Sequence, residues 1–183
     1  MMRLISGLVL LLVACGGGIA VNTDYDPLAS PRMESFKAWS WLQHPGGPDT
    51  RPDTVVATEV APAIERTLTA LGYRKDDANP EFRVGWHALR DQAVDVTTVN
   101  AYYGYAYGRW FPGGGVAYSR GFRTEYEPGT LVLDVADART NELIWRGIAR
   151  QVFGKNDATE QSRLLNEAIT RLFAQFPPSR PNN

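Results

Sequence analysis

The sequence contains a single cysteine, Cys15, which directly follows an apolar run that begins at Leu4. Without a second thiol, the chain cannot form an internal disulfide bond. A domain exported to an oxidising compartment would then lack any covalent cross-link, and its folded state must be stabilised by a hydrophobic core. This requirement limits the chain to folds that bury a large apolar surface.

The residues before Cys15 have the features of an export signal. Arg3 supplies a positive charge, the run from Leu4 to Ala14 is apolar, and the small residue Ala14 stands where a peptidase must accommodate a side chain. At about 1.5 Å of rise per residue, this run is too short to cross a hydrocarbon core of about 30 Å. We therefore predict that residues 1–14 are a signal peptide and not a membrane-spanning helix.

The tetrapeptide Leu12-Val13-Ala14-Cys15 resembles the bacterial lipobox. In a lipobox the cysteine thiol is lipidated and the chain is cut just before it, so the resemblance implies that Cys15 becomes the acylated first residue and takes up palmitate. Several acyl chains, at about 0.8 kcal/mol per buried methylene, anchor a protein stably. Three glycines follow, and we assign residues 15–20 to the lipidated cysteine and a flexible tether. A chance cysteine after an ordinary signal peptide is the alternative.

The residue after the cysteine bears on the destination of such a lipoprotein. An aspartate there would resemble the signal for retention at the inner membrane, whereas this chain has Gly16. We therefore expect a lipid-anchored protein of the outer membrane, facing the periplasm of a Gram-negative cell. The inner membrane and the cell surface remain alternatives.

Length and composition indicate one compact domain after the tether. We assign residues 21–178 to a single α+β domain and residues 179–183 to a C-terminal tail. The formal net charge is −1, and removal of Arg3 with the leader makes it more negative. Because no basic field is present to attract phosphates, we expect no nucleic acid among the partners.

The hydrophobic periodicity predicts a mostly antiparallel β-sheet covered by two amphipathic helices. Apolar residues recur at helical spacing from Val56 to Leu71, where Gly72 would end the helix, although Pro62 requires a kink or a later start. A second helix is expected after Asp157 and Glu160, which form a capping box, and before Pro177.

Several segments have the composition and alternation of strands. Residues 82–88 alternate between apolar and polar side chains, residues 93–103 continue as a second β-rich run, and residues 129–153 indicate an antiparallel hairpin joined by "RTNE". Shorter strands are expected at 21–25 and 35–42.

Five motifs, taken in order, resemble a bacterial lipoprotein family catalogued as domain of unknown function 4136. They run through nearly the whole chain after the tether: "VNTDYDP", "FKAW", "LGY", "GTLVLDVADARTNELIWRGIA" and "LFAQFPP". The family has no established activity, so the resemblance implies an envelope lipoprotein and no catalytic residues.

The candidate catalytic and metal-binding residues are few. A transition-metal site usually needs several His or Cys ligands, and the chain has only His44 and His87, with Cys15 consumed by lipid. We expect a solvated or hydrogen-bonded role for His87 on its strand and predict no metal, no cofactor and no catalytic histidine. No Gly-x-Ser-x-Gly elbow or phosphate-binding loop is present.

Asp24 and Asp26 flank Tyr25, so in a strand both carboxylates would point to one face. Such a pair could serve glycoside hydrolysis or bind a cation. Pro27 favours the alternative, in which the strand ends in an aspartate turn.

Residues 101–121 interleave aromatic side chains with glycines, a composition that excludes a helix. This many rings in a glycine-rich segment exceed what a core of this size can bury, so some are expected to be exposed or covered by a partner. The candidate partner contacts are Tyr105, Tyr107, Arg109, Trp110 and Phe111. We expect the flanks to pair as a hairpin with Trp110 and Phe111 near its tip. Rings that pack only on each other, and a loop that dips into the lipid headgroup region, are the alternatives.

Two hypotheses about function follow. The first is a lipid-anchored binding or scaffolding module that contacts an envelope protein or a glycan. The second is an envelope hydrolase that uses carboxylates near Asp24 and Asp26. We favour the first, and with it a role that is not enzymatic, because an anchor and an aromatic segment are present whereas catalytic motifs are not.

Overall fold

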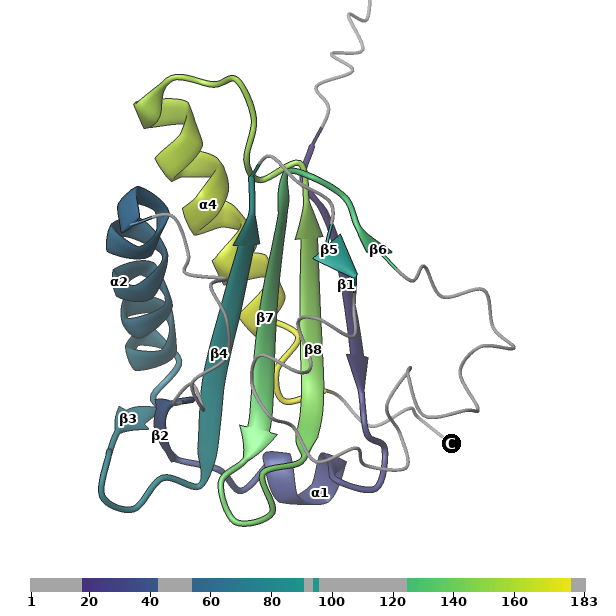
Figure 1. Ribbon diagram of the computed structural model, residues 1–183. Helices are drawn as coiled ribbons and strands as arrows, with labels where there is room; N and C mark the ends of the chain where they lie inside the picture. The colour runs from purple at the N-terminus through teal and green to yellow at the C-terminus, as the bar shows by residue number, and fades with distance from the viewer. Residues whose placement is uncertain (1–17, 43–53, 91–93, 96–124, 179–183) are drawn as a thin grey trace, which may run out of the picture.

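The computed structural model describes residues 18–42, 54–90, 94–95 and 125–178. The fold is α+β, and its main sheet is mixed but mostly antiparallel, with the strand order β1-β8-β7-β4-β2-β3 (Figure 1). The six strands are β1 (Ala20–Tyr25), β2 (Ala38–Trp41), β3 (Arg74–Lys75), β4 (Phe82–Leu89), β7 (Thr130–Asp137) and β8 (Leu143–Arg150). A separate pair consists of β5 (Val94–Asp95) and β6 (Glu125–Tyr126).

The described residues contain three helices, one more than expected. They are α1 (Ser30–Met33), α2 (Thr54–Ala70) and α4 (Ala158–Phe173). The short α1 follows the turn after β1 and lies at the end of the sheet where the β7–β8 hairpin turns (Figure 1). There Arg32 forms an ion pair of 2.9 Å with Asp137. No helix within the described ranges is both long enough and apolar enough to cross a membrane.

The β7–β8 hairpin is confirmed, and a side chain in its own turn stabilises it. Asp137 accepts hydrogen bonds from the backbone N–H groups of Arg139 and Thr140, at 2.8 and 3.1 Å. Asn141 takes a positive φ of 57°, a conformation that asparagine tolerates better than most residues. The two strands pair antiparallel, with a bulge between Val135 and Ala136.

The helix ends follow local sequence signals. Asp157 caps α4 by accepting a hydrogen bond of 2.9 Å from the N–H of Glu160. At the end of α2, Gly72 adopts a φ of 87° and donates to Thr69, while Tyr73 donates to Leu68; these two bonds define a Schellman motif. The helix α2 runs through Pro62 from Thr54, so the later start that Pro62 suggested is wrong.

The strand at residues 35–42 differs from its prediction in length and in burial. β2 spans only Ala38–Trp41, and Ala38, Trp39 and Ser40 are all buried, so the expected alternation is absent. β2 is an interior strand, because it pairs in parallel with both β3 and β4, and its buried residues lie on both of its faces. An interior strand covered on both faces has no solvated side for polar residues.

A single cluster of buried apolar side chains joins the sheet to the helices. From α2 it includes Val60, Ile64 and Leu68, and from α4 it includes Leu165, Ile169 and Leu172. The two helices also contact each other, and α4 contacts β1 and β8. Leu71, expected on the buried face of α2, lies beyond the end of the helix and is 48% exposed.

Candidate functional site

Most of the side chains singled out from the sequence lie outside the described residues. This holds for the lipidation candidate Cys15, for His44, and for the candidate partner contacts Tyr105, Tyr107, Arg109, Trp110 and Phe111. Asp24, Asp26 and His87 are described, and a buried polar cluster that was not predicted lies near two of them.

Asp24 and Asp26 bind the backbone around them. Asp24 Oδ1 accepts a hydrogen bond of 3.0 Å from the N–H of Tyr25. Asp26 Oδ1 accepts one of 2.9 Å from the N–H of Leu28, and its carbonyl accepts another from Ala29. Asp26 thus forms the aspartate turn that Pro27 favoured, and this turn leads from β1 into α1.

The face of the sheet opposite the core cluster carries a buried ion pair. Arg146 on β8 stands opposite Asp134 on β7. Its guanidinium donates two parallel hydrogen bonds to Asp134, from Nε to Oδ1 at 2.5 Å and from Nη2 to Oδ2 at 2.6 Å. A third bond of 3.0 Å runs from Nη1 to the hydroxyl of Tyr126. The side chains of Arg146 and Asp134 are only 5% and 1% exposed.

This cluster attaches β6 to the sheet. All three guanidinium nitrogens of Arg146 donate to described partners, and Tyr126, on β6, is one of them. A bidentate Arg–carboxylate pair is well suited to such a role because its geometry is rigid. The hydrogen bond to Tyr126 thus joins β6 to the pair formed by Arg146 and Asp134.

Asp24 lies on the edge strand β1, in line with Arg146 on β8 and Asp134 on β7, so charged residues stand opposite one another on three neighbouring strands. In the register of β1 and β8, Asp24 is the residue opposite Arg146. Burial raises the pKa of Asp24, while the N–H of Tyr25 and the positive charge of Arg146 act in the opposite direction. Burial likewise raises the pKa of the Tyr126 phenol. Arg146 therefore lies between two carboxylates in the strand register, and it binds Asp134 through two hydrogen bonds.

His87 also belongs to this face, opposite Val132 in the register of β4 and β7. It is only 8% exposed, so of the two expected roles the solvated one is wrong and the hydrogen-bonded one remains. The physical reason is that neighbouring residues on this face, including Val132 and Arg146, are buried as well. Among the described residues, no group of three or more His, Cys, Asp or Glu side chains is placed to hold a metal ion.

A second polar and aromatic cluster lies where β2 and β3 meet α2. Lys75 Nζ lies 5.7 and 5.8 Å from the ring centroids of Trp39 and Trp41. Glu65 accepts from both Lys75 Nζ at 2.6 Å and Trp41 Nε1 at 3.1 Å. The hydrogen bond from Lys75 lowers the pKa of Glu65. Lys75 is itself the cation that lies over the two tryptophan rings. Because Lys75 is on β3 and Glu65 is on α2, this cluster joins β3 to α2.

Neither the cluster around Arg146 nor the cluster around Lys75 was predicted from the sequence, although the sequence contains a signal for the Arg146 cluster. Asp134 is a charged residue between apolar neighbours on both sides in "LVLDVAD". A charge in a strand that is otherwise apolar on both faces indicates a buried partner, because an isolated buried charge is too costly to retain. Arg146 occupies the corresponding position in "LIWRGIA". The two segments together therefore indicate a buried ion pair between neighbouring strands.

A family model described as "Domain of unknown function (DUF4136)" matches residues 21–178. The chain belongs to this family. The match covers every helix and strand of the described fold except the first residue of β1, Ala20. No curated protein matches the DUF4136 chain.

Solved structures resemble this DUF4136 domain only distantly. One is a PDZ domain protein from Parabacteroides distasonis, with 13% identity and a TM-score of 0.47 over 90% of this chain. The match spans only 37% of that longer chain. Another is the PelC dodecamer from Paraburkholderia phytofirmans, with 10% identity and a TM-score of 0.43 over 85% of this chain and 95% of that chain. Likeness at this level carries no information about activity.

Proposed function

We propose that this DUF4136 protein is a lipid-anchored module of the cell envelope that binds or scaffolds another envelope component. The observation that supports the proposal is the small number of residues between the lipobox and the first buried residue of the domain. Ile19, four residues after Cys15, is only 4% exposed and belongs to the core cluster. A folded domain so close behind a modified cysteine is the arrangement of a protein displayed at a membrane surface.

The proposed module has two layers, with α2 and α4 covering the core face of the sheet. Its partner-binding part is the aromatic and glycine-rich segment within residues 101–121, between β5 and β6. Tyr, Trp and Arg side chains concentrate binding energy at protein interfaces, and aromatic rings also stack on sugars. The proposed partner is an envelope protein or a glycan, reached from the outer membrane on its periplasmic side.

The hydrolase hypothesis is less well supported by the described geometry. Asp26 shapes a turn, and Asp24 lies opposite Arg146 with its Oδ1 bound to the backbone. Both carboxylates therefore have structural roles that account for their presence, and we do not propose a catalytic function for them.

The anchor is tested by replacing the cysteine. We expect that Cys15→Ala abolishes the uptake of labelled palmitate and the cleavage of the leader, because the acceptor thiol is absent. Gly16→Asp is the matched control: it should keep the label but move the protein from outer-membrane to inner-membrane fractions in a density gradient. Continued labelling of Cys15→Ala would refute the anchor.

The binding role is tested on the aromatic segment. Replacing Tyr107, Trp110 and Phe111 together with serine should remove co-purifying envelope components while the melting temperature stays unchanged. Leu28→Ser, at a described residue that is 84% exposed, should alter neither. A collapse of thermal stability in the triple variant would instead place these rings in the core.

A further inference from the structure

The backbone is held in place by a hydrogen bond at Ile19, where the tether joins the folded domain. The carbonyl of Ile19 accepts a hydrogen bond of 2.8 Å from Arg171 Nη1 on α4. The next residue, Ala20, begins β1 and lies opposite Arg150 at the end of β8. The junction between the tether and the domain is therefore held by both the sheet and α4.

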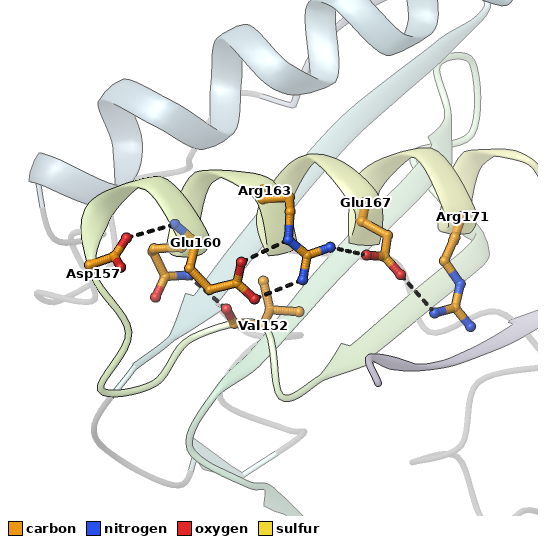
Figure 2. A network of polar contacts seen from close by, with 7 residues as sticks. Val152, Asp157, Glu160, Arg163, Glu167 and Arg171 are labelled. Carbon is orange, nitrogen blue, oxygen red and sulfur yellow. Dashed lines mark hydrogen bonds and ion pairs between the residues drawn. The ribbon is translucent and has the colours of Figure 1, made fainter. Parts of the chain in front are cut away.

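A row of ion pairs along α4 orients the arginine at this junction (Figure 2). Arg171 pairs with Glu167 at 3.3 Å, and Glu167 pairs with Arg163 at 3.0 Å. Arg163 in turn binds Glu160 at 2.7 Å in the first turn of the helix. Arg171 is thus held on the side of α4 where the start of β1 passes, as Figure 2 shows.

The strand registers show which segments share the end of the sheet where β1 begins. Thr130, the first residue of β7, lies opposite Leu89, the last residue of β4, and the loop 151–157 leaves β8 there. The other end carries the turn of the β7–β8 hairpin and α1 (Figure 1). Since β7 and β8 have eight residues each, the two ends are roughly 25 Å apart at about 3.3 Å per residue.

The covalent reach of the tether is shorter than this distance. Four residues lead from Cys15 to Ile19, and even fully extended they span at most about 14 Å. Building on the proposed lipidation of Cys15, we infer that the end of the domain with the loop 151–157 faces the lipid surface. The hairpin turn and α1 then face away from the membrane.

This orientation also determines where the exposed apolar side chains lie. Among the described residues, the large apolar side chains with the greatest exposure are Leu28, at 84%, and Leu71, at 48%. Leu28 follows the end of β1, and Leu71 precedes β3, which pairs with the start of β2. Both therefore belong to the end that points away from the lipid and toward the aqueous compartment.

The experiment uses the full lipidated protein in phosphatidylcholine vesicles that contain a lipid with a spin label on its headgroup. Lys155→Cys and Arg139→Cys each replace an exposed basic residue in a loop, at opposite ends of the sheet. Cys15 is blocked by its acyl chain, so a fluorophore attaches to the introduced thiol alone. We expect the spin label to quench the fluorophore at position 155 several-fold more strongly than the one at position 139.

The outcomes separate this inference from the proposed function. Equal quenching at the two positions, or stronger quenching at position 139, would overturn the orientation in a protein that still floats with the vesicles. Protein that does not float with the vesicles would instead refute the lipid anchor. Asn156→Cys provides a second label in the same exposed loop as Lys155 and should be quenched to the same extent.

Discussion

Arg146 is the residue whose surroundings depart most from those of a typical strand arginine. It is buried, binds Asp134 through two hydrogen bonds, and holds Tyr126 through a third. Buried pairs of this kind add little net stability relative to apolar residues, since both charges must leave water. Loss of one partner is costly, however, because the other charge stays buried without that partner's hydrogen bonds.

We predict that Arg146→Leu lowers the free energy of unfolding by about 3 to 5 kcal/mol, because Asp134 would remain buried without the two hydrogen bonds that Arg146 donates to it. Arg163→Leu is the matched control, since Arg163 also pairs with carboxylates but has a side chain that is 57% exposed. Its removal should change stability very little. The measurement is urea denaturation of the chain that starts at Gly16. Similar small losses in both variants would contradict the structural role of Arg146.

Asp24 and Glu65 should affect the pH dependence of stability with opposite signs. Burial raises the pKa of Asp24, so the folded state binds its proton more tightly than the unfolded state does. Its carboxylate therefore costs stability as pH rises above the ordinary value of 3.8. We expect Asp24→Asn to be more stable than the parent protein near pH 7, with the difference disappearing toward pH 3.

Glu65 provides the comparison because Lys75 lowers its pKa. Its contribution is present above the ordinary value of 4.5 and is lost as pH falls through the lower folded value. We therefore expect Glu65→Gln to be less stable than the parent protein near pH 7 and equal to it in strong acid. Thermal unfolding between pH 2.5 and 7 measures both differences, and the same sign for the two variants would contradict this assignment.

At the scale of elements, packing between β8 and α4 depends on a glycine in the strand. The ring of Trp145 lies across Gly147 and stacks on Phe173 of α4, with ring centroids 6.0 Å apart. A Cβ at Gly147 would lie 2.5 Å from the Trp145 ring and 3.0 Å from Leu172. The missing side chain is what lets the indole fill the space between the strand and the helix.

We predict that Gly147→Ala destabilises the domain by about 1 to 3 kcal/mol, the usual cost of excess volume in a packed core. Gly154→Ala is the control, because its Cβ would meet only Asn156, at 3.6 Å. The melting temperature should fall in the first variant and change little in the second. An unchanged near-ultraviolet circular dichroism spectrum in Gly147→Ala would show that Trp145 does not pack in this way.

At the scale of the whole molecule, residues from both ends of the described chain contribute to one core. Ile19 and Met33 belong to the same apolar cluster as Phe173 and Phe176. Ser30 Oγ also donates to the carbonyl of Pro178, at 3.5 Å. Because α2, α4 and the sheet share this cluster, the packing of any one element depends on the others.

We predict a single cooperative unfolding transition for the chain that starts at Gly16. Tryptophan fluorescence reports on Trp39 and Trp145 in the core, whereas far-ultraviolet circular dichroism reports on the backbone. In a two-state transition both signals give the same denaturation midpoint. Separate midpoints would show that the segment contains two folding units, against the assignment of residues 21–178 to one domain.

The sequence alone determined the features that depend on neighbouring residues. The hairpin turn at Asp137, the cap of α4 at Asp157 and the end of α2 at Gly72 each rest on bonds within a few residues. The periodicity likewise identified the core face of β4, with Phe82 and Val84 in the apolar cluster. The ordered motifs were sufficient to place the chain in its family.

Only the tertiary structure decided what covers each face and which strands are neighbours. Alternation assigns side chains to two faces but does not show whether the second face meets water, so the burial of His87 and Arg146 was not foreseen. The parallel placement of β2 between β3 and β4 depends on a connection through α2, which local spacing does not encode. These features arise from contacts between segments far apart in the chain, where the free energy depends on the whole core and not on the residues of one segment.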